Sequence, residues 1–180
     1  MILIISGTDR KDSLSLVLAK HYESLFLSRT QETVKILSLH DLPPETFQWG
    51  IYKKEDLSAA FILMEDTLLV PATKLFFIVP EYNGSYPGAL KYFIDLCSLR
   101  SKMLIFKKKK AGLVGVATGK SGNIRGLEHL GSVLNFMDVI TLPNKLPVSL
   151  FDKALDKTMT IVDPVLLKTL EAHAEDFIQF

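Results

Sequence analysis

The sequence predicts an α/β fold in which helices cover both faces of a central parallel sheet. Short, almost wholly apolar runs alternate with longer segments whose apolar residues recur at helical spacing. The apolar runs do not alternate with polar residues, which is the pattern of strands buried on both faces. We therefore expect a three-layer α/β/α sandwich.

The first half of the chain supplies two strand–helix pairs. Residues 1–5 are apolar and residues 33–39 begin with β-branched side chains, so both are expected to be strands. Helical spacing is present over 12–28 and 55–70. The loop between the second strand and the second helix contains Pro43 and Pro44, which forbid a continuous helix.

The second half continues in the same way. Three further strands are expected, at residues 74–79, 111–117 and 138–142. Three further helices are expected, at 87–99, 121–136 and 164–178. Because crossovers between parallel strands are right-handed, five strands of this kind suit the flavodoxin-like strand order 2-1-3-4-5. No linker interrupts the pattern, so residues 1–180 are expected to form a single domain.

Composition points to a cytoplasmic protein that binds neither nucleic acid nor membranes. The net charge is +1 and charged residues make up 23%, so no general electrostatic field favours nucleic acid. The densest basic run, residues 107–110, is expected to be a solvated loop at the start of a strand. The chain begins without the features of a signal peptide, and a single cysteine excludes an internal disulfide. Cys97 is expected to be a core thiol, and the four histidines show no metal-binding spacing.

A ligand site is expected at three turns. In an open parallel sheet, ligands bind beyond the carboxyl ends of the strands where the winding direction reverses. For this strand order the reversal lies between the first and third strands, with the turn after the fourth strand beside it. The three turns are polar and rich in glycine, and they are residues 6–15, 80–85 and 118–123.

The first and second turns offer different chemistry. The first carries hydroxyls, a guanidinium and the amino end of a helix, which suit a phosphate, although Asp12 or Ser13 could simply cap that helix. The second offers backbone groups, an amide and an aromatic ring, which suit a flat heterocycle. Ser85 is the expected cap of the helix that follows. The glycine-rich third turn could close over the same ligand.

Three stretches resemble the NADPH-dependent FMN reductase family, whose relatives include quinone, chromate and azo-dye reductases. The stretch PEYNGSYPGALKYFID, residues 80–95, resembles the family pattern P-E-Y-N-x-x-x-P-G-x-L-K-N-x-I-D. Residues 7–15 are similar to the family's phosphate loop, and residues 117–130 to its third turn. Four positions depart from the family's commoner residues: Thr8, Ser15, Tyr92 and Lys120.

The resemblance implies an FMN site and a cofactor-based reaction. It places the FMN phosphate among Thr8, Arg10, Ser13, Leu14 and Ser15. It places the isoalloxazine ring against Pro80, Glu81, Tyr82, Asn83 and Gly84, mostly through main-chain groups, with Thr118, Gly119 and Lys120 on the other side. It also implies a homodimer that uses the helix after the second turn.

The expected function is an NAD(P)H-dependent FMN reductase or quinone reductase. Hydride would pass from NADPH or NADH to bound FMN and on to a quinone, free flavin or similar small acceptor, with no side chain as catalytic residue and no metal. A phospho-acceptor receiver domain of the same strand order is disfavoured, because it needs acidic residues directly after the first strand and an aspartate at the end of the third, where this chain has Ser6-Gly7 and Pro80-Glu81. A non-catalytic flavin-binding sensor or interaction module is the alternative that the residues leave open. Trp49 and Tyr52 could cover a ring in this protomer or in a partner, or form a local cluster.

Overall fold

The computed structural model describes the backbone of the whole chain and the side chains of residues 1–100 and 104–180. Its strands form one parallel sheet with the order β2-β1-β3-β4-β5, and β6 also pairs with β4. The predicted flavodoxin-like order is therefore confirmed. The strands are β1 Ile2–Ser6, β2 Val34–Ser38, β3 Lys74–Pro80, β4 Lys110–Val116, β5 Ile140–Thr141 and β6 Leu146–Val148.

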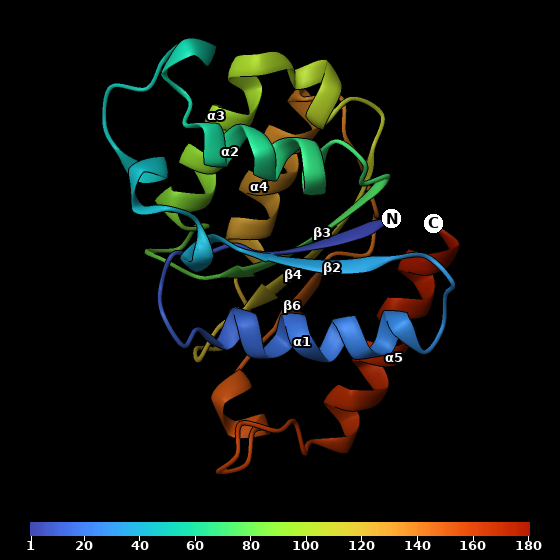
Figure 1. The fold of residues 1–180 in the computed structure, drawn as a ribbon. Coiled ribbons are helices and arrows are strands. Elements are labelled where there is room, and N and C mark those ends of the chain that lie inside the picture. The colour runs from blue at the N-terminus through green and yellow to red at the C-terminus, as the bar shows by residue number, and fades with distance from the viewer.

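Helices cover both faces of the sheet, which gives the three predicted layers (Figure 1). One face is covered by α1 Leu14–Leu27 and α5 Pro164–Gln179, and the other by α2 Ala59–Met64, α3 Gly88–Ile105 and α4 Ile124–Phe136. Each face has its own core, because the strand side chains that alternate between the faces meet a different set of helices. Cys97 is fully buried in the core under α3, as predicted.

The edge of the sheet next to β4 differs from the prediction of one strand at 138–142. Only Ile140–Thr141 pairs with the start of β4, and Leu146–Val148 pairs with its end, where Val114 faces Leu146 and Val116 faces Val148. Residues 143–145, between these two short strands, are not paired with β4. Pro147 lies inside β6, which is possible because an edge strand does not need every N–H for pairing.

The second helix begins later than predicted. Lys54–Asp56 forms a short 3-10 turn, and α2 starts only after Ser58, whose hydroxyl accepts a hydrogen bond from Phe61 N at 3.1 Å. The helix continues as a π-helical turn over Glu65–Leu69, closed by Val70 N donating to the Glu65 carbonyl at 2.8 Å. A π turn widens the backbone without breaking the apolar pattern, so helical spacing alone does not predict it.

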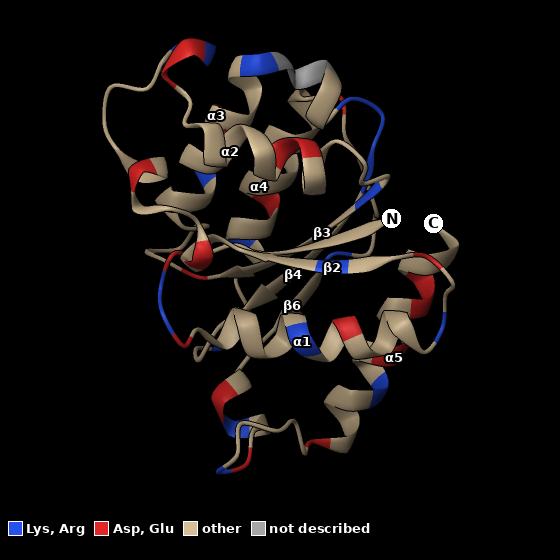
Figure 2. Ribbon diagram, in the orientation of Figure 1, with Lys and Arg blue, Asp and Glu red and all other residues tan. Residues whose placement is uncertain are grey.

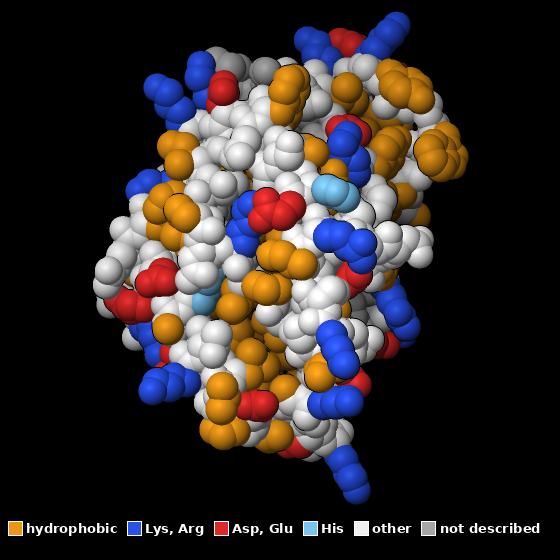
Figure 3. All heavy atoms as spheres, turned by 180° about the vertical axis from the view of Figure 1, so that it is seen from behind, with side chains coloured by type: hydrophobic (Ala, Val, Ile, Leu, Met, Phe, Trp, Pro, Cys, Tyr) orange, Lys and Arg blue, Asp and Glu red, His pale blue; other side chains and the backbone are white. Residues whose placement is uncertain are grey.

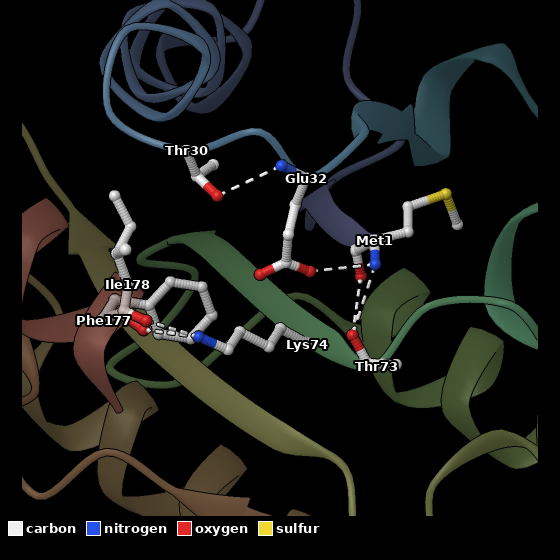
Figure 4. A network of polar contacts seen from close by, with 7 residues as sticks. All are labelled: Met1, Thr30, Glu32, Thr73, Lys74, Phe177 and Ile178. Atoms are coloured by element: carbon white, nitrogen blue, oxygen red, sulfur yellow. Dashed lines mark hydrogen bonds and ion pairs between the residues drawn. The ribbon is translucent and has the colours of Figure 1, made fainter.

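The amino ends of the strands are held together by polar contacts far from the predicted site (Figure 4). The amino group of Met1 lies 3.0 Å from a carboxylate oxygen of Glu32 and donates to the Thr73 hydroxyl. The Lys74 ammonium donates to the carbonyls of Phe177 and Ile178 at 3.3 and 2.6 Å, at the end of α5. The contacts of Lys74 hold the last turn of α5 against the start of β3.

The basic run 107–110 is more than the solvated loop expected from the sequence. The Lys109 ammonium donates to the carbonyls of Leu69 and Val70, and the Lys110 ammonium donates to the carbonyl of Phe180. Burial lowers the pKa of Lys109 to about 8. The two lysines satisfy carbonyls at helix ends, which is a structural role.

Basic and acidic residues are interspersed over the elements of the fold rather than gathered by sign (Figure 2). On the face opposite to the view of Figure 1, apolar side chains gather in the lower middle with Lys and Arg around them (Figure 3). Within the described part of the chain, no helix combines the length and the apolar character needed to cross a membrane.

Candidate functional site

The three polar turns meet at the carboxyl ends of β1, β3 and β4, as predicted. A cavity of about 260 Å³ has walls from all three turns. Its lining residues are Thr8, Arg10, Asp12, Ser13, Leu14, Pro80, Glu81, Tyr82, Val116, Ala117 and Thr118. A second cavity, of about 410 Å³, shares Glu81, Ala117 and Thr118 with the first and continues along Asn83, Gly84, Gly119, Lys120 and Ser121. One elongated site therefore runs across the sheet edge.

The first turn presents hydroxyl groups at the amino end of α1. Ser13 is the helix cap, and its hydroxyl accepts a hydrogen bond from Leu16 N at 3.3 Å. The Thr8 hydroxyl accepts one from Arg10 N at 3.2 Å. Arg10 and Asp12 are exposed and also line the cavity, so a guanidinium and a carboxylate stand at its rim. Free helix amides, hydroxyls and one guanidinium suit a phosphate, and Arg10 opposes the repulsion from Asp12.

Ser15 lies deeper than the resemblance implied. It is 0% exposed and lies behind the cavity wall, with its hydroxyl 3.1 Å from that of Ser6 and donating to that of Ser13 at 3.0 Å. Ser15 is therefore connected to the cavity through Ser13, which lines it. Ser6, the last residue of β1, lay within the predicted first turn, but its contact with Ser15 could not be inferred from the sequence.

The second turn is a tight reversal with its polar groups at the cavities. Tyr82 and Ser85 exchange two backbone hydrogen bonds of 2.9 and 3.1 Å. Asn83 and Gly84 between them have positive φ angles of 52° and 75°, a conformation that favours asparagine and glycine. This is why the buried strand β3 ends in residues that are polar and small.

Two side chains of the second turn tie it to the other turns. The Tyr82 hydroxyl lies 2.8 Å from the Thr8 hydroxyl, and the Glu81 carboxylate accepts a hydrogen bond from the Ser121 hydroxyl. The resemblance implied contacts mostly through main-chain groups in this stretch. In addition to any such contacts, these two side chains set the spacing of the three turns.

The third turn is hydrogen-bonded to the end of β3 and to the residues that follow β6. The buried Asn123 amide donates to the carbonyls of Val79 and Pro80 at 3.1 and 3.0 Å, at the end of β3. From β6 and the residues after it, Leu150 N donates to the Gly119 carbonyl at 3.0 Å and the Ser149 hydroxyl to the Lys120 carbonyl at 2.8 Å. Asn123 was not singled out by the sequence, where it reads as an ordinary loop asparagine.

The predicted cap at Ser85 is wrong. Helix α3 begins at Gly88, and the Ser85 hydroxyl lies 2.9 Å from Nδ1 of His129 on α4. The backbone reversal at Tyr82–Ser85 uses the residues that would otherwise lead directly into the helix. Ser85 therefore connects the second turn to α4.

A more apolar hollow of about 510 Å³ lies beside the site at the start of α3. The Trp49 and Tyr92 rings stand 6.3 Å apart there, and the Trp49 side chain is 93% exposed. The lining residues are Asp9, Phe47, Trp49, Gly88, Ala89, Lys91, Tyr92 and Asp95. Trp49 thus forms a local cluster with helix α3, one of the arrangements expected from the sequence.

Among the residues whose side chains are described, no three His, Cys, Asp or Glu residues are grouped so that they could hold a metal ion. His173 is buried, with Nδ1 3.1 Å from the Tyr22 hydroxyl and Nε2 2.9 Å from the Asn144 carbonyl. It lies on the buried side of α5, away from the three turns. The polar groups of the three turns are therefore the chemistry that this edge of the sheet offers.

Comparison with known proteins finds relatives that are reductases of flavins or quinones. An NAD(P)H-dependent FMN reductase of Pseudomonas aeruginosa is 41% identical over 68 residues, which cover 38% of this chain and 36% of that protein. A quinone reductase of Pseudomonas putida is 28% identical over 149 residues, covering 77% of this chain and 71% of that protein. The chain thus matches only about a third of the length of the first relative and over two thirds of the second.

The fold has solved counterparts. The structure of a flavoenzyme NAD(P)H:(acceptor) oxidoreductase from Paracoccus denitrificans matches with a TM-score of 0.81 and 22% identity, covering 99% of this chain and 94% of that one. At this identity the likeness shows the shared fold. The model of NADPH-dependent FMN reductases matches residues 1–153, a range that contains β1 to β6 and all three turns. The chain belongs to the NADPH-dependent FMN reductase family.

Proposed function

We propose that this chain is an FMN-dependent NAD(P)H oxidoreductase that passes electrons to a quinone, a free flavin or a similar small acceptor. The observation that carries the proposal is the pair of adjoining cavities at the carboxyl edge of the sheet. One is lined by hydroxyls and a guanidinium, and the other mainly by the second and third turns with their glycines. Membership of the family supports it, as do the relatives known as an NAD(P)H-dependent FMN reductase and a quinone reductase.

The residues present fit FMN. Thr8, Ser13 and Arg10, with the amides of Leu14 at the start of α1, would hold the phosphate. Pro80 to Gly84 on one side and Thr118 to Lys120 on the other would flank the ring. Ser15 would not contact the phosphate directly but would donate a hydrogen bond to Ser13. The two cavities share three lining residues, so a ligand with a phosphate at one end and a planar ring at the other can occupy both.

Bound FMN would supply the hydride chemistry, by accepting hydride from NADPH or NADH and giving electrons to the acceptor. The protein would bind and orient. The Tyr82–Thr8 and Glu81–Ser121 contacts hold the ring-facing turns at a fixed distance from the phosphate end. We assign no side chain as a proton donor or nucleophile, since placement and hydrogen bonding suffice for this reaction.

The purified full-length chain provides the test. We expect it to be yellow, to release FMN on heating, and to oxidise NADPH or NADH when a quinone, ferricyanide or free FMN is added. Flavin binding without nicotinamide oxidation would favour the alternative, a flavin-binding sensor or interaction module. A colourless protein that fails to bind added FMN would contradict both.

We further propose that residues 1–180 form one FMN-binding domain that works as a cytoplasmic homodimer without nucleic-acid or membrane partners. The support for the dimer is the apolar hollow with exposed Trp49 at the start of α3, the helix that the family resemblance places at the interface. Light scattering of the wild-type chain and of Trp49→Ala checks it. A wild-type monomer at micromolar concentration would rule the dimer out.

A further inference from the structure

We infer that the buried hydroxyls of Ser6 and Ser15 fix the direction of the Ser13 hydroxyl, so that its proton faces the cavity at the start of α1. Ser6 and Ser15 are positioning residues in this view, and Ser13 is the group that meets the ligand. The identity of that ligand, the phosphate of FMN, rests on the proposed function.

The Ser13 hydroxyl has both of its acceptor positions occupied. It accepts a hydrogen bond from Leu16 N at 3.3 Å and another from the Ser15 hydroxyl at 3.0 Å. A serine hydroxyl carries one proton and two lone pairs. With two donors directed at it, its own proton is left for a third partner. Ser13 lines the cavity, so that partner lies in the cavity.

Counting protons and lone pairs in the same way gives the donor of each hydrogen bond behind Ser13. Ser15 uses its one proton on Ser13, so in the 3.1 Å contact between Ser6 and Ser15 the proton comes from Ser6. Ser6 and Ser15 are both 0% exposed, so water does not compete for these bonds. The three hydroxyls therefore donate in one direction, from Ser6 to Ser15 to Ser13 and on to the ligand.

A preset donor suits a phosphate in particular. A phosphate dianion accepts hydrogen bonds and donates none, so a hydroxyl already turned to donate needs no reorientation on binding. Thr8, on the same wall, differs from Ser13. It accepts from Arg10 N, but either partner of its contact with Tyr82 could be the donor. Ser13 is thus the hydroxyl whose direction these contacts define.

Flavin selectivity measures this role, because riboflavin carries the ring of FMN without the phosphate. We would titrate the flavin-free full chain with FMN and with riboflavin and follow flavin fluorescence. Ser15→Ala is expected to weaken FMN binding about fivefold, because the Ser13 hydroxyl remains but loses the neutral hydrogen bond that turns its proton toward the phosphate. Riboflavin binding is expected to change by less than about twofold, since the ring contacts stay.

Ser15→Ala leaves the Ser6 hydroxyl buried without its acceptor, which can destabilise the chain. The double variant Ser6→Ala/Ser15→Ala replaces both buried partners by apolar groups and avoids this cost, and we expect the same selective loss of FMN. Ser24→Ala is the matched control. It removes a serine hydroxyl from the same helix, where it donates to the Lys20 carbonyl at 3.2 Å on the exposed side. Both flavin affinities should stay at the wild-type level.

The outcomes separate the two proposals. The wild-type chain is expected to prefer FMN to riboflavin. If Ser15→Ala and the double variant Ser6→Ala/Ser15→Ala both keep the wild-type ratio of FMN to riboflavin affinity, the positioning role is refuted while the proposed function stands. Equal losses for both flavins would refute it as well, because they would show general damage to the site. A wild-type chain that binds neither flavin would overturn the proposed function, and this inference with it.

Discussion

Protonation of His173 should weaken the fold in mildly acidic solution. Burial lowers the pKa of His173 from its ordinary value of 6.5, against smaller opposing effects of the Asn144 carbonyl and the Asp176 carboxylate. Its Nε2 faces a carbonyl oxygen, which can only accept, so the ring is neutral with its proton on Nε2. Nδ1 then accepts from the Tyr22 hydroxyl, whose burial raises its pKa well above 10. A second proton, on Nδ1, would oblige the buried Tyr22 hydroxyl to turn from donor to acceptor.

The sign and size of the effect follow from proton linkage. Between 6.5 and the lower pKa of the folded state, the unfolded chain binds more protons at this residue than the folded chain does. Stability from His173 is therefore fully present above pH 6.5 and is lost as the pH falls toward the folded-state pKa. The slope approaches about 1.4 kcal/mol per pH unit in that window. At pH 5.5 the loss reaches at most about 1.4 kcal/mol, the limit for a ring that stays unprotonated in the folded state.

Urea unfolding followed by circular dichroism at pH 7.5, 6.5 and 5.5 measures this directly. His173→Gln keeps an uncharged polar group at the position, so its stability disadvantage relative to wild type should shrink as the pH falls from 7.5 to 5.5, by at most about 1.4 kcal/mol. Tyr22→Phe is the control, because it removes the hydroxyl partner but keeps the imidazole. It should be less stable at every pH with the wild-type slope largely retained. A constant difference between wild type and His173→Gln over this range would refute the reasoning.

Three further predictions concern the site. In Gly115→Ala the new methyl group would lie 2.1 Å from the Gly122 carbonyl oxygen. The free energy of unfolding, measured by urea titration, should therefore fall by about 2 kcal/mol. The FMN affinity, measured by flavin titration, should fall as well. Tyr82→Phe removes the contact with Thr8, and flavin titration should show an FMN affinity lower by about fivefold. Arg10→Ala should weaken FMN binding about tenfold in the same titration and leave riboflavin binding nearly unchanged, because the lost group faces the phosphate end.

Matched variants make these outcomes interpretable. Gly88→Ala adds a methyl group with no atom within 4 Å, so it should change neither stability nor flavin affinity appreciably. Arg29→Ala removes an arginine at the far end of α1, where it donates to the Leu25 carbonyl and the Ser28 hydroxyl. If it lowered FMN affinity as much as Arg10→Ala, the specific role of Arg10 would be contradicted. Wild-type FMN affinity in Tyr82→Phe would show that the link to Thr8 does not shape the site.

The buried parts of the fold could be predicted from the sequence, and its edge could not. Strands β1, β3 and β4 are continuous apolar runs, and this pattern has one structural meaning when helical segments separate the runs. Strands β5 and β6 are two and three residues long. Runs that short carry no periodicity, and the proline inside β6 argues against a strand in any position except an edge.

The candidate site could be located from the sequence, because strand order alone determines which turns meet. Its internal contacts could not. Ser15 and Asn123 are buried polar residues whose roles depend on partners nine or more positions away in the chain. Ser85 has the residue type of a helix cap, but the backbone reversal before α3 takes it elsewhere. Local residue type cannot distinguish a hydroxyl facing a ligand from one that orients its neighbour.

The attachment of the third turn to residues after β6 has a consequence for hydrogen exchange. The carbonyls of Gly119 and Lys120 are satisfied by groups of Leu150 and Ser149, about thirty positions later in the chain. Opening of this short edge segment would break both contacts at once, so the third turn and the edge should open as one unit. Slow exchange at the Leu150 amide would then report an intact third turn at the candidate site, although that amide lies outside both cavities.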